Sequence, residues 1–131
     1  MNTSGQFAPS AEAIEAMARA AIDKLPEQFA AHLDNVLLIV EDFAEDSVLD
    51  DLGIEDPFAL TGLYHGRHIG EPAATGDQPP AIYLYRRPIL DEWIEGGEEL
   101  GHLVRHVVIH EIGHHFGLSD DDMHALEDAA K

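Results

Sequence analysis

The hydrophobic positions in the first part of the chain predict a helix followed by a strand. In residues 10–25, apolar side chains recur at the i, i+3, i+4, i+7 spacing of a helix with one buried face, at Ile14, Met17, Ala18, Ala21, Ile22 and Leu25. Ser10 is a suitable N-cap for this helix and Pro26 supplies a stop. Residues 29–33 predict a short further turn of helix, and the apolar, β-rich residues 35–41 predict a central strand.

The middle of the chain predicts a second strand among irregular segments. Residues 81–87 alternate well enough to predict a strand that ends at Pro88, followed by a short helix over residues 88–93. The remaining segments predict an acidic surface loop, a short ordered piece and an exposed connection rich in Gly and Pro, at residues 41–56, 60–64 and 70–80.

The last part of the chain predicts a long helix and a short one. Residues 98–116 form the long helix, which ends at Gly117, where helices commonly place a left-handed residue. Ser119 precedes three aspartates and predicts the capped, acid-rich first turn of a last helix that runs to residue 130.

The long helix carries an H-E-x-x-H motif. His110 and His114 are four residues apart and share one helix face, and Glu111 projects alongside them. Apolar residues lie roughly opposite, at Ile109, Ile112 and Phe116. One face therefore packs while the other presents two imidazoles, which is typical of a zinc hydrolase.

A catalytic zinc ion needs three protein ligands and an open position for water. His110 and His114 supply two ligands, and Glu111 is expected to act as the general base that takes a proton from the zinc-bound water and passes it to the leaving amine. The third ligand must follow the chain reversal at Gly117, and Asp120 is favoured on spacing. The alternatives that stay open are Asp121, Asp122 and, more weakly, His124.

Several further residues lie near the motif in sequence or chemistry. His115 points about 100° away from His114 and is expected to contact a ligand or face solvent. His102 and His106 precede the motif at four-residue intervals, but such a ladder drifts about 40° per step, so surface positions are expected, with one contact from His106 to a ligand as the alternative. The donor for a developing oxyanion stays open among Tyr64, His65, Tyr83, Tyr85, Arg86 and Arg87, although packing is the favoured role of Tyr83 and Tyr85.

Composition limits the class of protein. At 131 residues and 45% hydrophobic content, the chain predicts a single domain over residues 1–131, with residues 1–9 flexible. The absence of cysteine excludes disulfides and thiolate ligands, and no leader or membrane span is recognisable, which predicts a cytoplasmic protein. A formal net charge of −19 argues against nucleic acid or anionic membranes as partners and favours a basic or neutral one, unless the charge serves solubility alone.

Residues 82–90 (IYLYRRPIL) and 110–120 (HEIGHHFGLSD) resemble the small bacterial minimal-zincin family of zinc metallopeptidases, as does Leu60-Thr-Gly-Leu-Tyr64 with Gly66. The resemblance implies a compact α/β (α+β) domain with a small mixed sheet, an N-terminal helix, an active-site helix and a short C-terminal helix. It also implies His110, His114 and Asp120 as ligands of Zn²⁺ and Glu111 as the catalytic residue. By the same resemblance, residues 82–86 are expected to be the edge strand that pairs with an extended peptide.

We therefore expect a monomeric zinc metallopeptidase that hydrolyses a peptide bond in an extended peptide or protein. Two alternatives stay open: a catalytically silent, metal-stabilised module that binds a protein, and a zinc hydrolase that acts on a small amide or ester. Other divalent metals, such as nickel, cobalt or iron, also suit His and carboxylate ligands in a purified sample.

Overall fold

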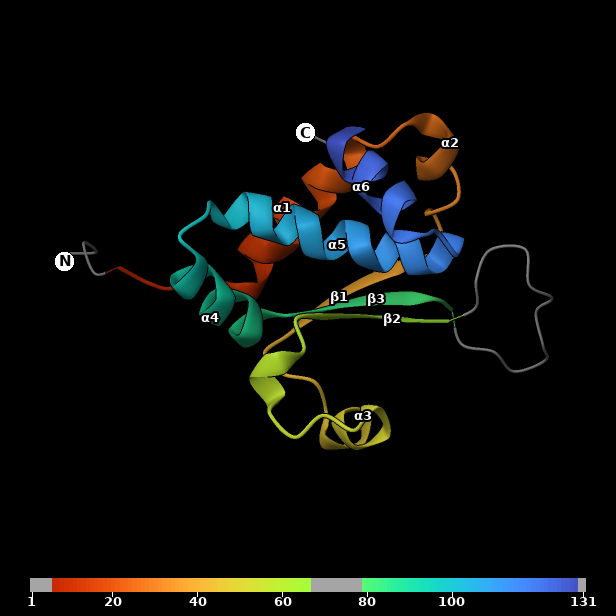
Figure 1. Ribbon diagram of the computed structural model, residues 1–131. Helices are drawn as coiled ribbons and strands as arrows, with labels where there is room; N and C mark the ends of the chain where they lie inside the picture. Colours follow the sequence, from red (N-terminus) through yellow and green to blue (C-terminus); the bar gives the residue numbers. More distant parts are fainter. Residues whose placement is uncertain (1–5, 67–78, 130–131) are drawn as a thin grey trace.

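A three-stranded mixed sheet lies between two layers of helix (Figure 1). The structure, a computed structural model, describes residues 6–66 and 79–129. The strands are β1 (Leu37–Glu41), β2 (Gly62–His65) and β3 (Ala81–Tyr85), and their order in the sheet is β1-β3-β2. Central β3 pairs in parallel with β1 and antiparallel with β2. The small mixed sheet and the surrounding helices confirm the expected α+β class.

Helix α1 (Ala11–Asp23) begins where its cap was predicted. The Ser10 hydroxyl accepts a hydrogen bond from the Ala13 amide at 3.1 Å, so one of the free amides of the first turn has a partner. The helix ends at Asp23, and Pro26 instead precedes α2 (Glu27–Ala30).

The main core lies between α1, α5 (Leu100–Phe116) and the sheet, and α6 (Asp120–Ala129) packs on α5. Helices α1 and α5 lie on the same side of the sheet (Figure 1). The largest fully buried side chains of this core are aliphatic and come from α1, β3, α4 (Arg86–Gly96) and α5: Ile14, Ile82, Leu84, Ile89, Leu103, Val104, Val108, Ile109 and Ile112. Alternation along β3 directs Ile82 and Leu84 toward this core and sends Tyr83 and Tyr85 to the other face.

The predicted surface loop at residues 41–56 is wrong, because it contains α3 (Asp46–Leu52). Helix α3 and the short η1 (Pro57–Ala59) form the smaller layer on the second face of the sheet (Figure 1). Asp46 lies in the first turn of α3, where an acidic residue stabilises a helix. Gly53 ends the helix in the left-handed conformation, with φ 69°. Leu49 is buried there against Tyr85.

Two strands were predicted at the wrong positions in the sheet: the strand expected at the centre lies at an edge, and the strand expected at an edge lies at the centre. Residues 35–41 were predicted as a central strand, but β1 lies at an edge and its side chains are only partly buried. Residues 82–86 were expected to be the edge strand, but β3 is paired on both sides. Strand β2 is the edge strand beside α5. Strand order depends on pairing between distant segments, which a local apolar pattern does not encode.

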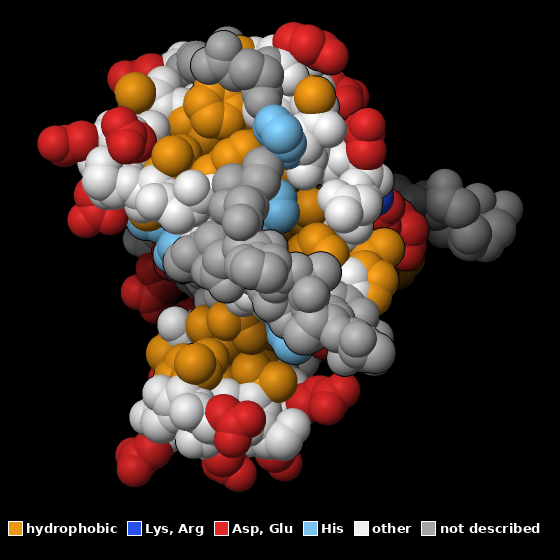
Figure 2. All heavy atoms as spheres, turned by 90° about the vertical axis from the view of Figure 1, so that its right-hand side faces the viewer, with side chains coloured by type: hydrophobic (Ala, Val, Ile, Leu, Met, Phe, Trp, Pro, Cys, Tyr) orange, Lys and Arg blue, Asp and Glu red, His pale blue; other side chains and the backbone are white. Residues whose placement is uncertain are grey.

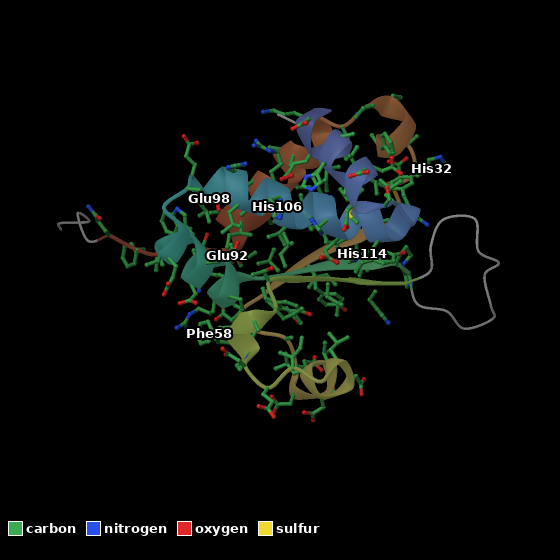
Figure 3. The ribbon with its side chains drawn as sticks, viewed as in Figure 1. His32, Phe58, Glu92, Glu98, His106 and His114 are labelled. Atoms are coloured by element: carbon green, nitrogen blue, oxygen red, sulfur yellow. The ribbon has the colours of Figure 1, made fainter. Side chains whose placement is uncertain are left out.

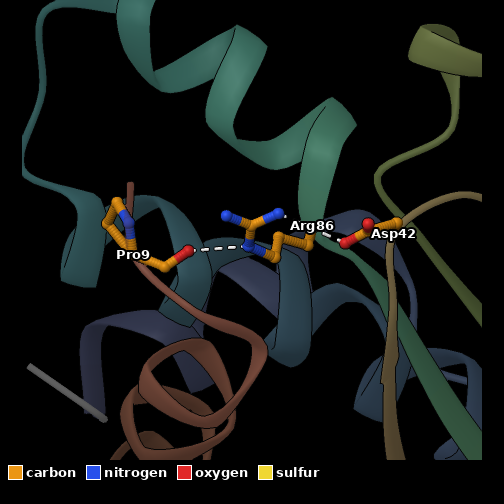
Figure 4. Close-up of polar contacts among 3 residues, drawn as sticks. All are labelled: Pro9, Asp42 and Arg86. Carbon is orange, nitrogen blue, oxygen red and sulfur yellow. Dashed lines mark hydrogen bonds and ion pairs between the residues drawn. The ribbon is translucent and has the colours of Figure 1, made fainter. Parts of the chain in front are cut away.

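Strand β3 passes directly into α4, two residues before the predicted helix start. Pro88 lies within the first turn of α4, where its missing N–H costs no hydrogen bond, so it continues the helix instead of only ending the strand. Arg86 ties this junction to two other segments (Figure 4): its Nε donates to the Pro9 carbonyl at 2.7 Å, and one terminal nitrogen lies 3.3 Å from the Asp42 carboxylate.

Most of the predicted exposed connection at residues 70–80 lies outside the described residues, as do residues 1–5 of the predicted flexible segment. None of the helices that the structure describes has the length and apolar character needed to cross a membrane.

Candidate metal centre

The three motif residues lie in the last two turns of α5, above the sheet. His110 is partly buried, and the side chain of His114 is 52% exposed. Figure 3 shows His114 near the end of α5 on the side of the strands. Glu111, in contrast, is buried, with 8% of its surface exposed. The helix thus presents two imidazoles of differing exposure and keeps the intervening carboxylate away from bulk water.

The Glu111 carboxylate is held between its own helix and strand β2. Its Oε1 lies 3.0 Å from Nδ1 of His114. On the other side, Gly62 of β2 comes so close that a Cβ there would lie 3.4 Å from Cγ of Glu111 and 2.8 Å from Cγ1 of Val107. A glycine is therefore required for the edge strand to pass beside the motif.

The chain reverses after the motif as predicted. Gly117 is left-handed with φ 68°, and the amides of Gly117 and Leu118 donate to carbonyls of the last turn of α5. The Ser119 hydroxyl accepts from the Asp122 amide at 3.2 Å, which confirms the predicted cap, and exposed Asp120 opens α6.

Helix α6 returns along α5 at close range. A Cβ at Gly113 would lie 2.4 Å from the sulfur of Met123, so the glycine inside the motif allows the two helices to touch. Within residues 6–66 and 79–129, however, no three His, Asp or Glu side chains are grouped closely enough to hold a metal ion. The structure brings His110 and His114 onto one helix but does not assemble them with Asp120 into a ligand set.

The donor chemistry of this region fits zinc. Imidazole nitrogen and carboxylate oxygen are zinc ligands, and the chain has no thiol to compete with them. His114 uses Nδ1 toward Glu111, which leaves Nε2 on the far side of an exposed ring for a ligand. A buried carboxylate that orients a neighbouring imidazole is the kind of contact that supports metal ligands.

The other histidines of α5 have separate partners. His115 is buried, with 6% of its surface exposed, and its Nδ1 lies 2.8 Å from the Tyr64 hydroxyl, so solvent exposure of this residue is wrong. His106 lies 2.7 Å from Oε1 of Glu127 on α6, and its ring centroid is 4.8 Å from that of His110. The ring of His106 therefore packs beside that of His110, while its Nδ1 pairs with Glu127, and the role of His110 as a metal ligand stays a prediction.

His102 and His124 are exposed. His102 is exposed and lies 3.2 Å from Glu98, which confirms the predicted surface position. His124, the weaker rival to Asp120, is exposed on α6.

The six predicted oxyanion donors lie on the two faces of the sheet and at the start of α4. Tyr83 and Tyr85 stack on the face opposite α5, with ring centroids 6.2 Å apart, which confirms packing as their role. Arg86 holds Pro9 and Asp42, and Arg87 lies over the ring of Phe43. His65 follows Tyr64 along β2, so its side chain leaves from the other face. Tyr64 is the one of the six that packs against α5.

Two parts of this arrangement were missed from the sequence. The pairing of Tyr64 with His115 joins residues 51 positions apart and has no local signal. The close approach of β2 does have one, because Gly62 interrupts an otherwise bulky segment, and a glycine inside a strand often marks a near neighbour.

Comparison with known protein families identifies the family of this chain. A family model for zincin-like metallopeptidases matches residues 33–130, which is more than half of the chain and includes the whole motif and the turn after it. No curated protein matches the chain. On the family match, together with the motif on α5 beside an edge strand, this chain belongs to the zincin-like metallopeptidase family.

Proposed function

We propose that this protein is a zinc-dependent peptidase that cleaves an extended peptide lying along β2. The proposed ligands are His110, His114 and Asp120, with Glu111 as the general base. The observation that carries the proposal is the position of Glu111, which is buried between α5 and the edge strand and is in contact with His114. A zinc ion bound there would supply a Lewis acid able to polarise a carbonyl and to acidify water.

The role of Glu111 follows from its surroundings. Its Oε1 contacts His114, and the other oxygen is available to accept a proton from the attacking water and to deliver it to the leaving amine. Because Glu111 is 8% exposed, few water molecules compete for that oxygen. Gly62 of β2 lies beside the side chain of Glu111, so a peptide that pairs with β2 would pass close to the carboxylate.

Strand β2 is the proposed substrate platform. It pairs with β3 on one side, and among the described residues no strand pairs with its other side. An extended peptide can form main-chain hydrogen bonds with such an edge and would then pass next to Glu111. This assignment replaces the expectation for residues 82–86, which lie in the centre of the sheet.

Tyr64 is the proposed donor to the oxyanion. Its side chain leaves β2 on the α5 side, the same side as Glu111, and its hydroxyl contacts His115. A tyrosine hydroxyl that is already oriented by a buried histidine can donate to charge that develops on a carbonyl oxygen.

The test is cleavage of a diverse peptide library by zinc-loaded wild-type protein and by zinc-loaded Glu111→Gln. The amide is close in size to the carboxylate but cannot take a proton, so we expect cleavage by the wild type and none by the variant, with equal zinc content. Equal cleavage by both proteins contradicts the proposal. Absence of cleavage by zinc-loaded wild type also contradicts it and favours the alternative of a metal-stabilised binding module.

A further inference from the structure

A cavity lies on the face of β2 that is turned away from α5. It has a volume of about 520 Å³ and opens between the sheet and helix α3. Its lining comes from all three strands and from α3, and includes Tyr83, Tyr85, Leu63, His65, Val48 and Leu52. Figure 2 shows hydrophobic side chains gathered on the lower part of the molecule, toward α3, with carboxylates around them.

Three carboxylates line the same cavity: Glu41 at the end of β1, and Glu45 and Asp51 at α3. Among the described residues that line the cavity, none is a lysine or an arginine. Across the part of the chain that the structure describes, none of these three carboxylates forms an ion pair. The cavity therefore carries negative charge that the described residues do not neutralise.

The base of the cavity is aromatic and includes the hydroxyl of Tyr85. Tyr83 and Tyr85 stack at 6.2 Å with an interplanar angle of 16°. Tyr85 is 1% exposed, and its hydroxyl has no hydrogen-bond partner within residues 6–66 and 79–129. Burial and the nearby charge of Glu41 raise the pKa of Tyr85 to about 12, so the hydroxyl stays neutral. Its oxygen can accept a hydrogen bond from a donor that enters the cavity.

The cavity and the motif lie on opposite faces of one edge strand. Along β2, the side chain of Tyr64 packs against α5 and Gly62 lies beside it, whereas Leu63 and His65 alternate with them and line the cavity, which Tyr64 also borders. A peptide that pairs with β2 has the same two-residue alternation. Side chains of one parity therefore point toward the motif, and those of the other parity point toward the cavity.

We propose that this cavity receives the side chain of a lysine or arginine from the extended peptide, which makes the protein selective for basic substrates. This inference rests on the proposed function, because it takes β2 as the platform for the substrate. An extended aliphatic stem suits Val48, Leu52 and Leu63, while the cationic end meets the tyrosine rings and the carboxylates. Both kinds of contact favour a cation over a neutral side chain of equal length.

The test compares peptides that contain arginine with counterparts in which citrulline replaces it, because citrulline keeps the shape and removes the charge. The peptides are capped at both ends and carry the residue at each position in turn. Cleavage by zinc-loaded protein is followed by mass spectrometry, and peptide affinity for zinc-loaded Glu111→Gln is measured by fluorescence anisotropy. The second measurement does not depend on catalysis.

Glu45→Gln combined with Asp51→Asn removes two cavity charges from exposed positions. The matched control is Asp91→Asn combined with Glu92→Gln, which removes two exposed charges on α4, outside the cavity (Figure 3 labels Glu92). Both double variants change the net charge equally. A difference between them in the preference for arginine is therefore due to the cavity charges and not to the net charge of the protein.

We expect a preference for arginine at positions of one parity only. In the cavity variant this preference should fall about tenfold, in KM and in peptide affinity more than in kcat, and the control should match the wild type. Cleavage without a basic preference overturns the inference and leaves the proposed function intact. Absence of cleavage with arginine-selective, cavity-dependent binding to the Glu111→Gln protein supports the cavity and overturns the peptidase. Equal affinity for arginine and citrulline peptides overturns the cavity assignment.

Discussion

The Glu111 carboxylate combines burial with a short contact to an imidazole, at 8% exposure and 3.0 Å from His114. A buried carboxylate needs a hydrogen-bonding neighbour, because a polar group without a partner is costly to bury. His114, three residues further along the same helix, is that neighbour. The pair therefore stabilises a geometry in which a proton acceptor and a predicted metal ligand are held together.

The motif itself was predictable because its geometry is local. His110, Glu111 and His114 belong to one turn of helix, so their spacing alone places them together. Tyr64 and His115 were not paired in advance, because their contact depends on how β2 packs across α5. The assembly of Asp120 with the two histidines stays a prediction.

Replacement of Tyr64 by Phe tests the proposed oxyanion donor. Loss of a donor that acts in the transition state should lower kcat about 100-fold and leave KM near the wild-type value. The change also removes a partner from the buried His115, so thermal unfolding should be recorded with the kinetics. A folded variant with wild-type kcat excludes Tyr64 from this role.

Tyr85→Phe tests the environment of the Tyr85 hydroxyl. The folded-state pKa of about 12 lies above the ordinary value of 10.0, so the unfolded chain loses this proton first as pH rises. The neutral Tyr85 side chain therefore contributes fully to the free energy of unfolding below about pH 10. This contribution decreases between about pH 10 and pH 12, by at most about 1.4 kcal/mol per pH unit. In urea unfolding between pH 8 and pH 11.5, the free energy of unfolding should fall less in the variant than in the wild type. An equal fall in both proteins contradicts the raised pKa of Tyr85.

At the scale of elements, the packing of α6 on α5 depends on one glycine. Met123 lies in the space that a Cβ at Gly113 would enter, with sulfur at 2.4 Å and Cγ at 2.5 Å from that position. The overlap involves the middle of the methionine side chain, so relief requires Met123 to adopt another rotamer or α6 to shift. Because Asp120 begins α6, such a shift would also move the proposed third ligand.

Gly113→Ala should therefore destabilise the protein by about 1 to 2 kcal/mol, since overpacking of about 1 to 3 kcal/mol outweighs the gain of up to about 1 kcal/mol in helix propensity. Met123→Ala removes the obstacle at the cost of a cavity. In urea unfolding, the double variant should lose at least about 1 kcal/mol less than the sum of the single losses. If the loss in the double variant equals the sum of the two single losses, an overlap between Met123 and the Cβ that Gly113→Ala introduces is contradicted.

Elements with strong local signals were predicted well. The helices at residues 10–25 and 98–116 have a periodic apolar face and a capping or stop residue, Ser10 or Gly117, and both appear near their predicted bounds. Helix α3 was missed because its acidic residues were interpreted as a loop, although Val48, Leu49 and Leu52 with Gly53 give a helical spacing and a stop. The positions of β1 and β3 in the sheet were wrong because strand order is a property of the whole domain.

At the scale of the whole molecule, β2 is the element on which both proposals depend. The motif lies on one face of this strand and the acidic, aromatic cavity lies on the other. The formal net charge of −19 adds a general attraction for cationic peptides, which salt would weaken. Local charge at the cavity and overall charge thus favour the same class of substrate, and the matched double variants separate the two effects.

The most direct test of the central claim is the return of activity when zinc is added to metal-stripped protein, measured on one peptide selected from the library. The wild type should regain cleavage in proportion to added zinc, up to one equivalent per chain. Glu111→Gln should take up zinc equally and regain none. Cleavage that does not depend on zinc, or that the variant regains to the wild-type level, contradicts the assignment of this protein as a zinc peptidase with Glu111 as its base.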